Sequence, residues 1–150
     1  FLTMAAGLAA ITSNVNVPLG VMAYLGLALW IFGFSIEVIA DRQKRNFKKR
    51  QNKDKEFITS GLWAWSRHPN YLGEIILWTG IAAIALPVLV GWQLITLMSP
   101  FFVYYLLTKV SGIEMQERQN DEAWASDPDY WRYKETTPAL WPFTKLPGSQ

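Results

Sequence analysis

The sequence predicts an all-α fold: a polytopic membrane helical bundle with about three full transmembrane helices and a partial amino-terminal one. Hydrophobic residues make up 51% of the 150 residues, with eight tryptophans, which is more apolar than is usual for a soluble domain. The apolar residues also cluster, because residues 18–40 contain one charge and residues 75–107 contain none. A helix needs about 20 apolar residues to cross a bilayer, so both runs are long enough to span.

The limits of each span follow from the apolar runs and from the residues that break helices. Residues 18–40 form one span. The second run is too long for one helix and contains Pro87 and Gly91, so we expect a hairpin of two helices there. The chain opens inside apolar sequence without a methionine, and we expect further helices before it. The chain is then a single membrane domain over residues 1–150, with spans at about 1–12, 18–40, 71–86 and 92–109.

Charge predicts the orientation of the bundle. Residues 41–56 contain eight lysines or arginines and three acids, a net charge of 8 − 3 = +5. Loops rich in Lys and Arg stay cytoplasmic, so we expect the basic loop 41–57 and the carboxy-terminal tail on the cytoplasmic side of a bacterial inner membrane or its equivalent. The chain has no cysteine and one histidine. This excludes thiolate chemistry, and we predict no metal site.

Charged residues at the cytoplasmic end of the first full span share one face. Glu37, Asp41, Lys44 and Lys48 are spaced by four, three and four residues, which aligns them along one side of a helix. Glu37 lies about one turn inside the apolar run, where an unpaired carboxylate is costly. We expect it to face the bundle interior and a cationic or hydrogen-bonding partner. Lysines that snorkel to lipid headgroups are the alternative interpretation of this face.

The densest polar motif is the segment 67–74, which contains the single histidine. His68 precedes a proline and should be extended, and Asn70 is predicted to cap the following helix. A helix start with Arg67 beside it is an anion site suited to phosphate. Glu74, one turn on, is placed to accept from a ligand amide or hydroxyl. The alternative is a helix cap with an interfacial arginine–glutamate pair.

Aromatic residues and the tail supply the remaining candidates. Trp63 precedes Arg67 by about one helical turn, so it is a better candidate than its neighbour Trp65 for stacking on a flat ligand ring. Aromatic belts at bilayer interfaces are the common alternative. Glu117 lies in the acidic tail, which we expect to continue the last helix. Tyr130 and Tyr133 are three residues apart and fit one helical face.

Together these motifs resemble the membrane reductase family of steroid 5-alpha-reductases and sterol C14 reductases, in particular its bacterial branch of unknown function (DUF1295-like). The resemblance covers roughly residues 26–143. The matching residues are Gly33-Phe34, Glu37, Ala40-Asp41, Gln43-Lys44, Phe47-Lys48, Gly61-Leu62-Trp63, Ser66-Arg67-His68-Pro69-Asn70-Tyr71-Leu72-Gly73-Glu74, Ser111-Gly112-Ile113, Tyr130 and Tyr133. The sequence departs from the family at Glu114, where proline is usual.

The resemblance implies a cytoplasm-facing NADPH pocket and NADPH-dependent reduction of a carbon–carbon double bond in a steroid-like or isoprenoid-like lipid. This chain would supply the cofactor-binding half. The implied cofactor-binding residues are Glu37, Asp41, Lys44, Lys48, Trp63, Arg67, His68, Asn70, Tyr71, Glu74, Glu117, Tyr130 and Tyr133. The glycine-rich fingerprint of a Rossmann site is absent. In such reductases the groups that polarise the substrate lie in amino-terminal helices, so no catalytic proton donor is named.

The resemblance also assigns a role to each part of this set. The two lysines would meet phosphates and Trp63 a cofactor ring. The segment 67–70 would bind phosphate, ribose or carboxamide, and Glu74 would orient the nicotinamide end. Glu117 and the two tyrosines would close the tail over the nucleotide, while Asp41 would brace the basic residues.

Two other functions stay open at this point. A methyltransferase of the isoprenylcysteine type, which uses S-adenosylmethionine, shares Arg67-His68-Pro69 and the tail carboxylates, but that cofactor has no phosphates for a basic stretch to neutralise. A non-catalytic integral subunit of a larger membrane complex would keep the fold. The expected partners are membrane lipid, a lipid-like small molecule and, for the subunit, other chains of the complex. No nucleic-acid partner is expected.

Overall fold

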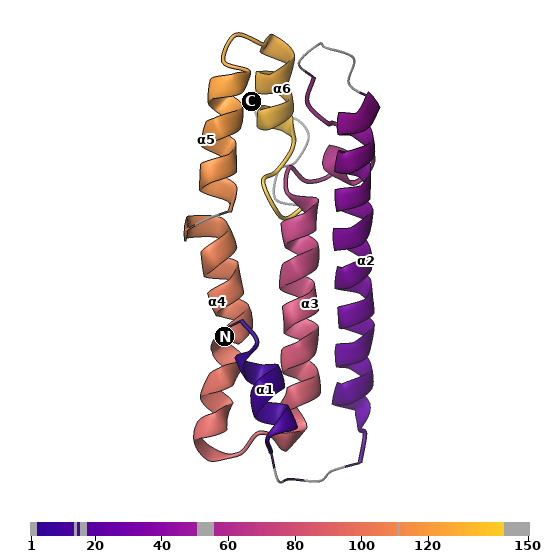
Figure 1. The fold of residues 1–150 in the computed structure, drawn as a ribbon, viewed down its shortest axis with the longest axis vertical. Coiled ribbons are helices and arrows are strands. Elements are labelled where there is room, and N and C mark those ends of the chain that lie inside the picture. Colours follow the sequence, from indigo (N-terminus) through magenta and orange to yellow (C-terminus); the bar gives the residue numbers. More distant parts are fainter. Residues whose placement is uncertain (1–2, 14, 16–17, 51–55, 111, 143–150) are drawn as a thin grey trace.

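The computed structural model confirms the all-α membrane bundle. It describes residues 3–13, 15, 18–50, 56–110 and 112–142, and no strand occurs in these ranges. Within them, three helical stretches are long and apolar enough to cross a membrane: Val21–Arg50, Pro69–Val88 and Gly91–Ala123. The three run side by side along the long axis of the molecule and alternate in direction (Figure 1). The two ends of the bundle are therefore chemically distinct.

The amino-terminal helix is short, and the first full crossing is longer than the sequence predicts. Helix α1 (Ala5–Ile11) packs against α3 through a small core that contains Ala6, Ala82 and Ala85. Helix α2 (Val21–Arg50) does not end near residue 40 but continues through the basic residues. Lysine and arginine are good helix formers and favour a helix carboxyl end, so the polar extension keeps the helical geometry beyond the apolar run.

Glycines hold α2 against α3 (Pro69–Ala85). Gly26 and Gly33 on α2 face Gly80 and Gly73 on α3, in antiparallel order. A Cβ added at Gly33 would lie 2.6 Å from the Gly73 carbonyl oxygen, and one at Gly80 would lie 2.6 Å from that of Gly26. Only a hydrogen fits at these distances. The backbones therefore approach as closely as small residues permit in membrane helix pairs.

The hairpin after α3 turns where the sequence predicts a break. A short 3₁₀-helix, η2 (Leu86–Val88), follows α3, and the next 3₁₀-helix, η3, begins at Gly91. The φ angle of Gly91 is 57°, a left-handed conformation that glycine adopts at little cost. This residue reverses the chain for the third crossing.

The third crossing is not the uniform helix predicted over residues 92–109. It consists of η3 (Gly91–Met98), α4 (Ser99–Tyr105) and a π-helical turn, η4 (Leu106–Val110). Pro100 lies in the first turn of α4 and has no N–H to donate to the preceding turn, so regular helical bonding restarts there. A prediction from composition does not detect such changes between 3₁₀-, α- and π-helical hydrogen bonding.

The charged tail continues the third crossing beyond a break at Gly112 and then folds back at the end of the bundle (Figure 1). At Gly112 an added Cβ would lie 2.0 Å from the Leu107 carbonyl oxygen, and helix α5 (Ile113–Ala123) starts after this break. Asp127 caps helix α6 (Pro128–Thr136) by accepting from the backbone N–H of Asp129 at 2.9 Å. In Figure 1, α6 lies beside α5 at the end of the bundle where α2 ends and α3 begins. We call this the charged end.

The glycine contacts lead to a stability prediction. Replacing Gly33 with alanine should lower the free energy of unfolding by about 1–3 kcal/mol, because the new methyl group meets backbone atoms that cannot move aside. Gly20→Ala is the matched control, since nothing lies within 4 Å of its added Cβ. Circular dichroism would monitor the unfolding of both variants in detergent and so compare their stabilities. Equal stability of the two variants would contradict this packing.

Candidate functional site

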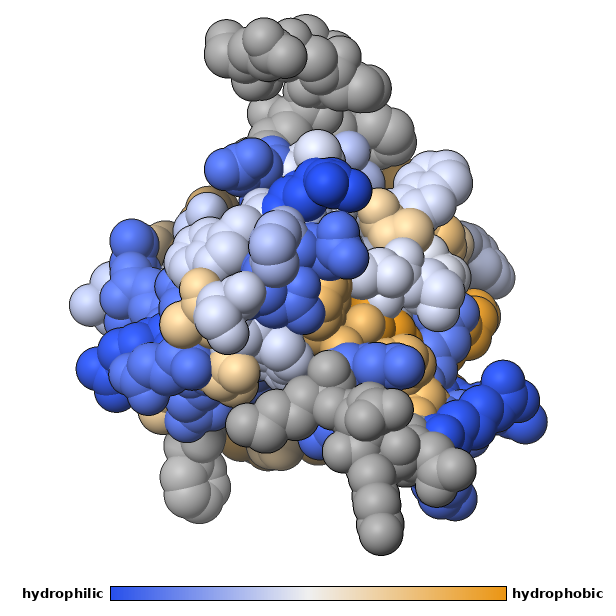
Figure 2. Space-filling model, turned by 90° about the horizontal axis from the view of Figure 1, so that it is seen from above, coloured by the Kyte–Doolittle hydropathy of each residue, from blue (hydrophilic) through white to orange (hydrophobic). Residues whose placement is uncertain are grey.

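The charged end brings together five elements of the described chain, some of them far apart in the sequence. The carboxyl end of α2, the 3₁₀-helix η1 (Gly61–Ala64), the start of α3 and the helices α5 and α6 meet there. Viewed onto this end, hydrophilic residues dominate the surface, and apolar surface shows in the hollow between them (Figure 2). The end therefore combines exposed charge with an apolar floor.

Helix η1 is fixed to α2 by two hydrogen bonds. The Trp63 indole Nε1 donates to the Ala40 carbonyl oxygen at 3.1 Å, and the Leu62 backbone N–H donates to Gln43 Oε1 at 3.0 Å. Trp63 is 4% exposed, whereas Trp65 is 64% exposed. Trp63 is thus the tryptophan of this pair that faces inward, and Lys44 Nζ lies 5.0 Å from its ring centroid.

The segment 66–68 holds the tail. The Arg67 backbone N–H donates to the Pro138 carbonyl oxygen at 3.0 Å, and Ser66 Oγ donates to that of Ala139 at 3.2 Å. Arg67 Nη1 donates to the Thr137 carbonyl oxygen at 2.9 Å and to that of Lys134. These bonds satisfy the backbone carbonyls after α6 ends. They tie the tail to the start of α3.

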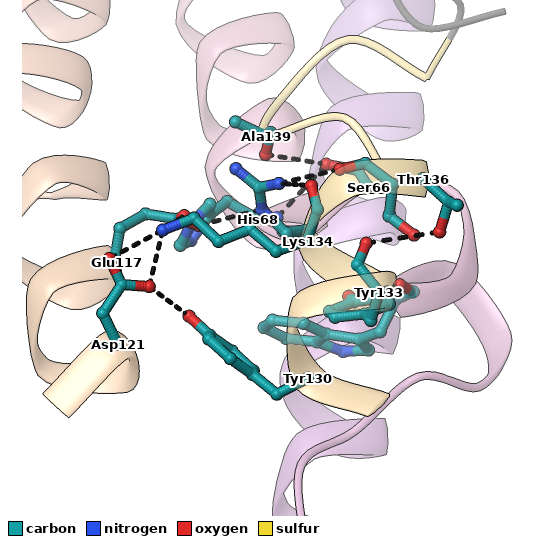
Figure 3. A network of polar contacts seen from close by, with 12 residues as sticks. Ser66, His68, Glu117, Asp121, Tyr130, Tyr133, Lys134, Thr136 and Ala139 are labelled. Atoms are coloured by element: carbon teal, nitrogen blue, oxygen red, sulfur yellow. Dashed lines mark hydrogen bonds and ion pairs between the residues drawn. The ribbon is translucent and has the colours of Figure 1, made fainter. Parts of the chain in front are cut away.

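Glu117 on α5 accepts hydrogen bonds from two residues of this segment, Arg67 and His68. Its Oε1 lies 3.0 Å from Arg67 Nε and 2.8 Å from His68 Nε2, and its Oε2 lies 3.3 Å from Lys134 Nζ. Figure 3 shows the carboxylate in the middle of this network, between α5 and α6. Because the Arg67 and Glu117 side chains are only 12% and 14% exposed, the ion pair is mostly desolvated and is stronger than a surface pair.

A second carboxylate extends the network along α5. Asp121 accepts from the Tyr130 hydroxyl at 2.7 Å, and its Oδ2 lies 2.7 Å from Lys134 Nζ. The Tyr133 hydroxyl donates to the Trp63 carbonyl oxygen at 2.6 Å. Burial, then the bond to Asp121, raises the pKa of Tyr130 well above its usual value, and burial does the same to the pKa of Tyr133. Both tyrosines stay neutral donors at physiological pH.

His68 is the most deeply placed polar residue of the site. It is 1% exposed and stacks on Tyr71 at a centroid distance of 5.6 Å. The Tyr71 hydroxyl accepts from Gln116 Nε2 at 2.8 Å. Since His68 Nε2 faces a carboxylate, it carries the proton in the neutral ring, and Nδ1 is then an acceptor. Nδ1 has no hydrogen-bond partner within the described ranges.

These elements enclose a cavity of about 210 Å³, which we call the polar cavity. Its lining combines cations, acids, amides and aromatic rings. The lining residues are Lys44, Phe47, Lys48, Glu56, Phe57, Ile58, Trp63, Arg67, His68, Gln116, Glu117, Asn120, Trp124, Tyr130 and Tyr133. Lys44 and Lys48 lie close enough to repel each other, which favours an anion near them. The set suits a ligand with anionic groups and flat rings.

Eight of the residues predicted from the sequence line the polar cavity: Lys44, Lys48, Trp63, Arg67, His68, Glu117, Tyr130 and Tyr133. The other five do not appear in its lining: Glu37, Asp41, Asn70, Tyr71 and Glu74. Of these, Tyr71 supports His68 from behind, and Asp41 attracts Lys44. Their assignment as ligand contacts stays a prediction.

One local prediction was wrong, and a second was met only in part. Asn70 does not cap α3, because the helix begins at Pro69 with His68 in the cap position. Proline has a helical φ and lacks an N–H, so it favours the first helical position and moves the cap one residue earlier. Glu37 has no salt bridge among the described residues. Its electrostatic neighbours there are Glu74 and Asp41, which are acids rather than the expected cation.

Sequence reasoning missed the residues that complete the cavity. Phe57, Trp124, Asn120 and Gln116 line it, and Lys134 connects the two carboxylates of α5. The spacing of Gln116, Asn120 and Trp124 by fours was a usable signal, since such residues share a helical face. Nothing in the sequence shows which face of α5 turns inward, because its partners His68 and Tyr71 are 49 and 45 residues away along the chain.

The fold and the site define a class: a helical integral membrane bundle with a polar cavity at one end. The comparison with known families narrows it. A family model described as a protein of unknown function (DUF1295) matches residues 1–137. The chain therefore belongs to the DUF1295 family, as the motifs of the segment 66–74 predict.

Two curated relatives match part of the chain. An uncharacterized protein of Schizosaccharomyces pombe is 30% identical over 50% of this chain and 28% of its own length. The 3-oxo-5-alpha-steroid 4-dehydrogenase 1 of Mus musculus is 32% identical over 46% of this chain and 25% of its own length. The chain thus spans about a quarter of these relatives. No solved structure matches. The similarity supports a steroid-reductase-like family.

The Glu117 network leads to a second prediction. Glu117→Ala should lower the free energy of unfolding by about 3 kcal/mol, because it leaves Arg67 without its mostly buried counter-charge and His68 Nε2 without its acceptor. It should also expose the Lys134 backbone to trypsin. Glu114→Gln is the control on the same helix, since Glu114 is 61% exposed, and it should change little. Detergent unfolding and limited proteolysis give the measurement. A stable, protected tail in Glu117→Ala would refute the tail-holding role.

Proposed function

We propose that this chain is the cofactor-binding half of an NADPH-dependent membrane reductase that acts on a carbon–carbon double bond of a steroid-like or isoprenoid-like lipid. The observation that carries the proposal is the polar cavity. It places two lysines from the carboxyl end of α2 and several aromatic rings beside the start of α3, in a chain similar to a steroid dehydrogenase. The charged end would face the cytoplasm, where the dinucleotide is found.

The chemistry of the lining fits a phosphorylated dinucleotide. Lys44 and Lys48 would meet phosphates, and Trp63 would present a ring face to a flat group. His68 Nδ1, a buried acceptor without a partner in the described ranges, would accept from an amide or hydroxyl. NADPH supplies a hydride when bound. The residues of this chain bind it, orient it and limit the access of water. S-adenosylmethionine has no phosphates, so the two lysines favour the dinucleotide.

Arg67 has a supporting role in this proposal. Its Nε and Nη1 groups already donate to Glu117 and to carbonyl groups of the tail. These donors therefore hold the protein together rather than contact a ligand. A change at Arg67 would therefore disturb the tail together with the cavity. The lysines give a cleaner test because neither forms a salt bridge among the described residues.

A second cavity supports a lipid-like substrate. It measures about 630 Å³ and lies between α3 and α4. Its lining is nearly all apolar: Ile75, Thr79, Ala82, Ala83, Leu86, Leu97, Pro100, Phe101, Tyr104 and Trp141. The Thr79 hydroxyl already donates to the Ile75 carbonyl oxygen at 2.8 Å. No charged residue lines this cavity, so it would accept an uncharged apolar molecule at the depth of the bilayer. The chain alone does not name a proton donor.

The proposal predicts that the lysines control nucleotide affinity. Lys44→Gln and Lys48→Gln should each weaken NADPH binding by about tenfold or more, because each removes a charged hydrogen-bond donor to phosphate. Lys49→Gln, on the same helix but outside the cavity lining, should bind as the wild type does. Calorimetric titration of the detergent-solubilised chain measures these affinities. If the wild type does not bind NADPH at millimolar concentration, the proposal fails.

A further inference from the structure

The polar cavity has two ends along α5. Glu117, Asn120 and Trp124 all line it and are spaced by three and four residues, so they share one helical face. Seven residues at a rise of 1.5 Å place Trp124 about 10 Å further along the helix than Glu117. Glu117 contacts the deeply buried His68, whereas Trp124 lies where α5 has ended. We call these the inner and outer ends.

The outer end is built from aromatic rings. The Phe57 centroid lies 5.7 Å from that of Trp124 and 5.4 Å from that of Tyr130, and the Trp124 and Tyr130 centroids are 5.6 Å apart. Residues 56–59 have no regular secondary structure, so no helical hydrogen bonds fix the backbone of Phe57. The Phe57 ring meets Trp124 at an interplanar angle of 66°. A flat group stacked on the Phe57 ring would therefore present its edge to the Trp124 indole.

Unpaired polar atoms mark both ends of the same cavity. Two buried side-chain atoms lack a hydrogen-bond partner within the described ranges, His68 Nδ1 and Trp124 Nε1, and both residues line the polar cavity. By contrast, the indoles of Trp63 and Trp131 donate to backbone carbonyl oxygens at 3.1 and 3.0 Å. A buried donor without an acceptor destabilises the folded chain. The Trp124 indole, which can only donate, requires an acceptor.

We propose that Phe57 and Trp124 form the binding site for the adenine base of the nucleotide, with the base stacked on the Phe57 ring and its edge turned to Trp124 Nε1, which donates to a ring nitrogen. This rests on the proposed function. Adenine offers unprotonated ring nitrogens at its edge as acceptors. The hydride-carrying ring would lie at the inner end beside His68, nearer the membrane-spanning segments. A flat base also stacks well on aromatic side chains.

The cavity volume fits this arrangement. At about 210 Å³ it is smaller than the roughly 300–1,000 Å³ of a typical ligand pocket. The cavity therefore holds only part of a dinucleotide unless a wall moves. Phe57 belongs to a stretch of the wall without regular secondary structure, residues 56–58. A base that enters beside Trp124 would displace the Phe57 ring and accept from the Trp124 indole.

Binding of nucleotide fragments tests the proposal. Calorimetry of the full detergent-solubilised chain would compare NADPH, adenosine monophosphate and nicotinamide mononucleotide. Trp124→Phe keeps an aromatic ring but removes the donor, and it should weaken NADPH and adenosine monophosphate by about tenfold, with nicotinamide mononucleotide unchanged. Phe57→Leu should have a similar selective effect through lost stacking. Trp65→Phe, at an exposed tryptophan outside the lining, is the matched control.

The outcomes separate this inference from the proposed function. Unchanged NADPH and adenosine monophosphate affinity in both variants overturns the adenine site while the NADPH proposal stands. A selective loss of nicotinamide mononucleotide instead places the other ring at Trp124 and also overturns it. If the wild type binds adenosine monophosphate through Trp124 but not NADPH, the adenine site holds and the reductase proposal fails. Thermal unfolding verifies each variant, and Phe57→Leu carries the test if Trp124→Phe does not fold.

Discussion

The close contact between α2 and α3 is the constraint on which the rest of the structure depends. Gly26 and Gly33 lie against Gly80 and Gly73 at distances that exclude any side chain, so the two helices cannot slide or separate without losing the fit. In a bilayer, where apolar helices gain little by leaving lipid, such shape complementarity is a main source of helix association. The pairing also places the Ala40 carbonyl where Trp63 binds it.

The charged end follows from this pairing. With α2 and α3 fixed, two hydrogen bonds hold η1 against α2. His68 then lies at the start of α3, facing α5 through Glu117. The tail returns over the same point because Ser66 and Arg67 bind its carbonyl groups. One motif therefore joins the membrane helices to the tail and forms a wall of the polar cavity.

This double role changes the interpretation of the arginine in the motif. Arg67 beside a helix start looks like a phosphate ligand, yet it is occupied by a carboxylate and by backbone carbonyls. Cations at the carboxyl end of α2 have no such partners in the described part of the chain and are better placed for a ligand anion. In a family described only as of unknown function, the distinction separates residues that build the cavity from residues that would bind within it.

The sequence by itself determined the class of fold, the family and most of the polar candidates. The backbone of a long apolar run in a membrane can form all its hydrogen bonds as a helix. Charged residues at the ends of such runs are costly to keep there unless they bind a partner. Asn70 and Glu37 show the limit of local reasoning. The capping role predicted for Asn70 depends on the exact residue at which α3 starts. The partner predicted for Glu37 depends on which side chains the neighbouring helix places beside it. The inward face of α5, the capture of Arg67 by Glu117 and the aromatic outer end were decided by tertiary structure. Several of these contacts join residues far apart along the chain, as with Arg67 and Glu117, and no local periodicity encodes which distant faces meet.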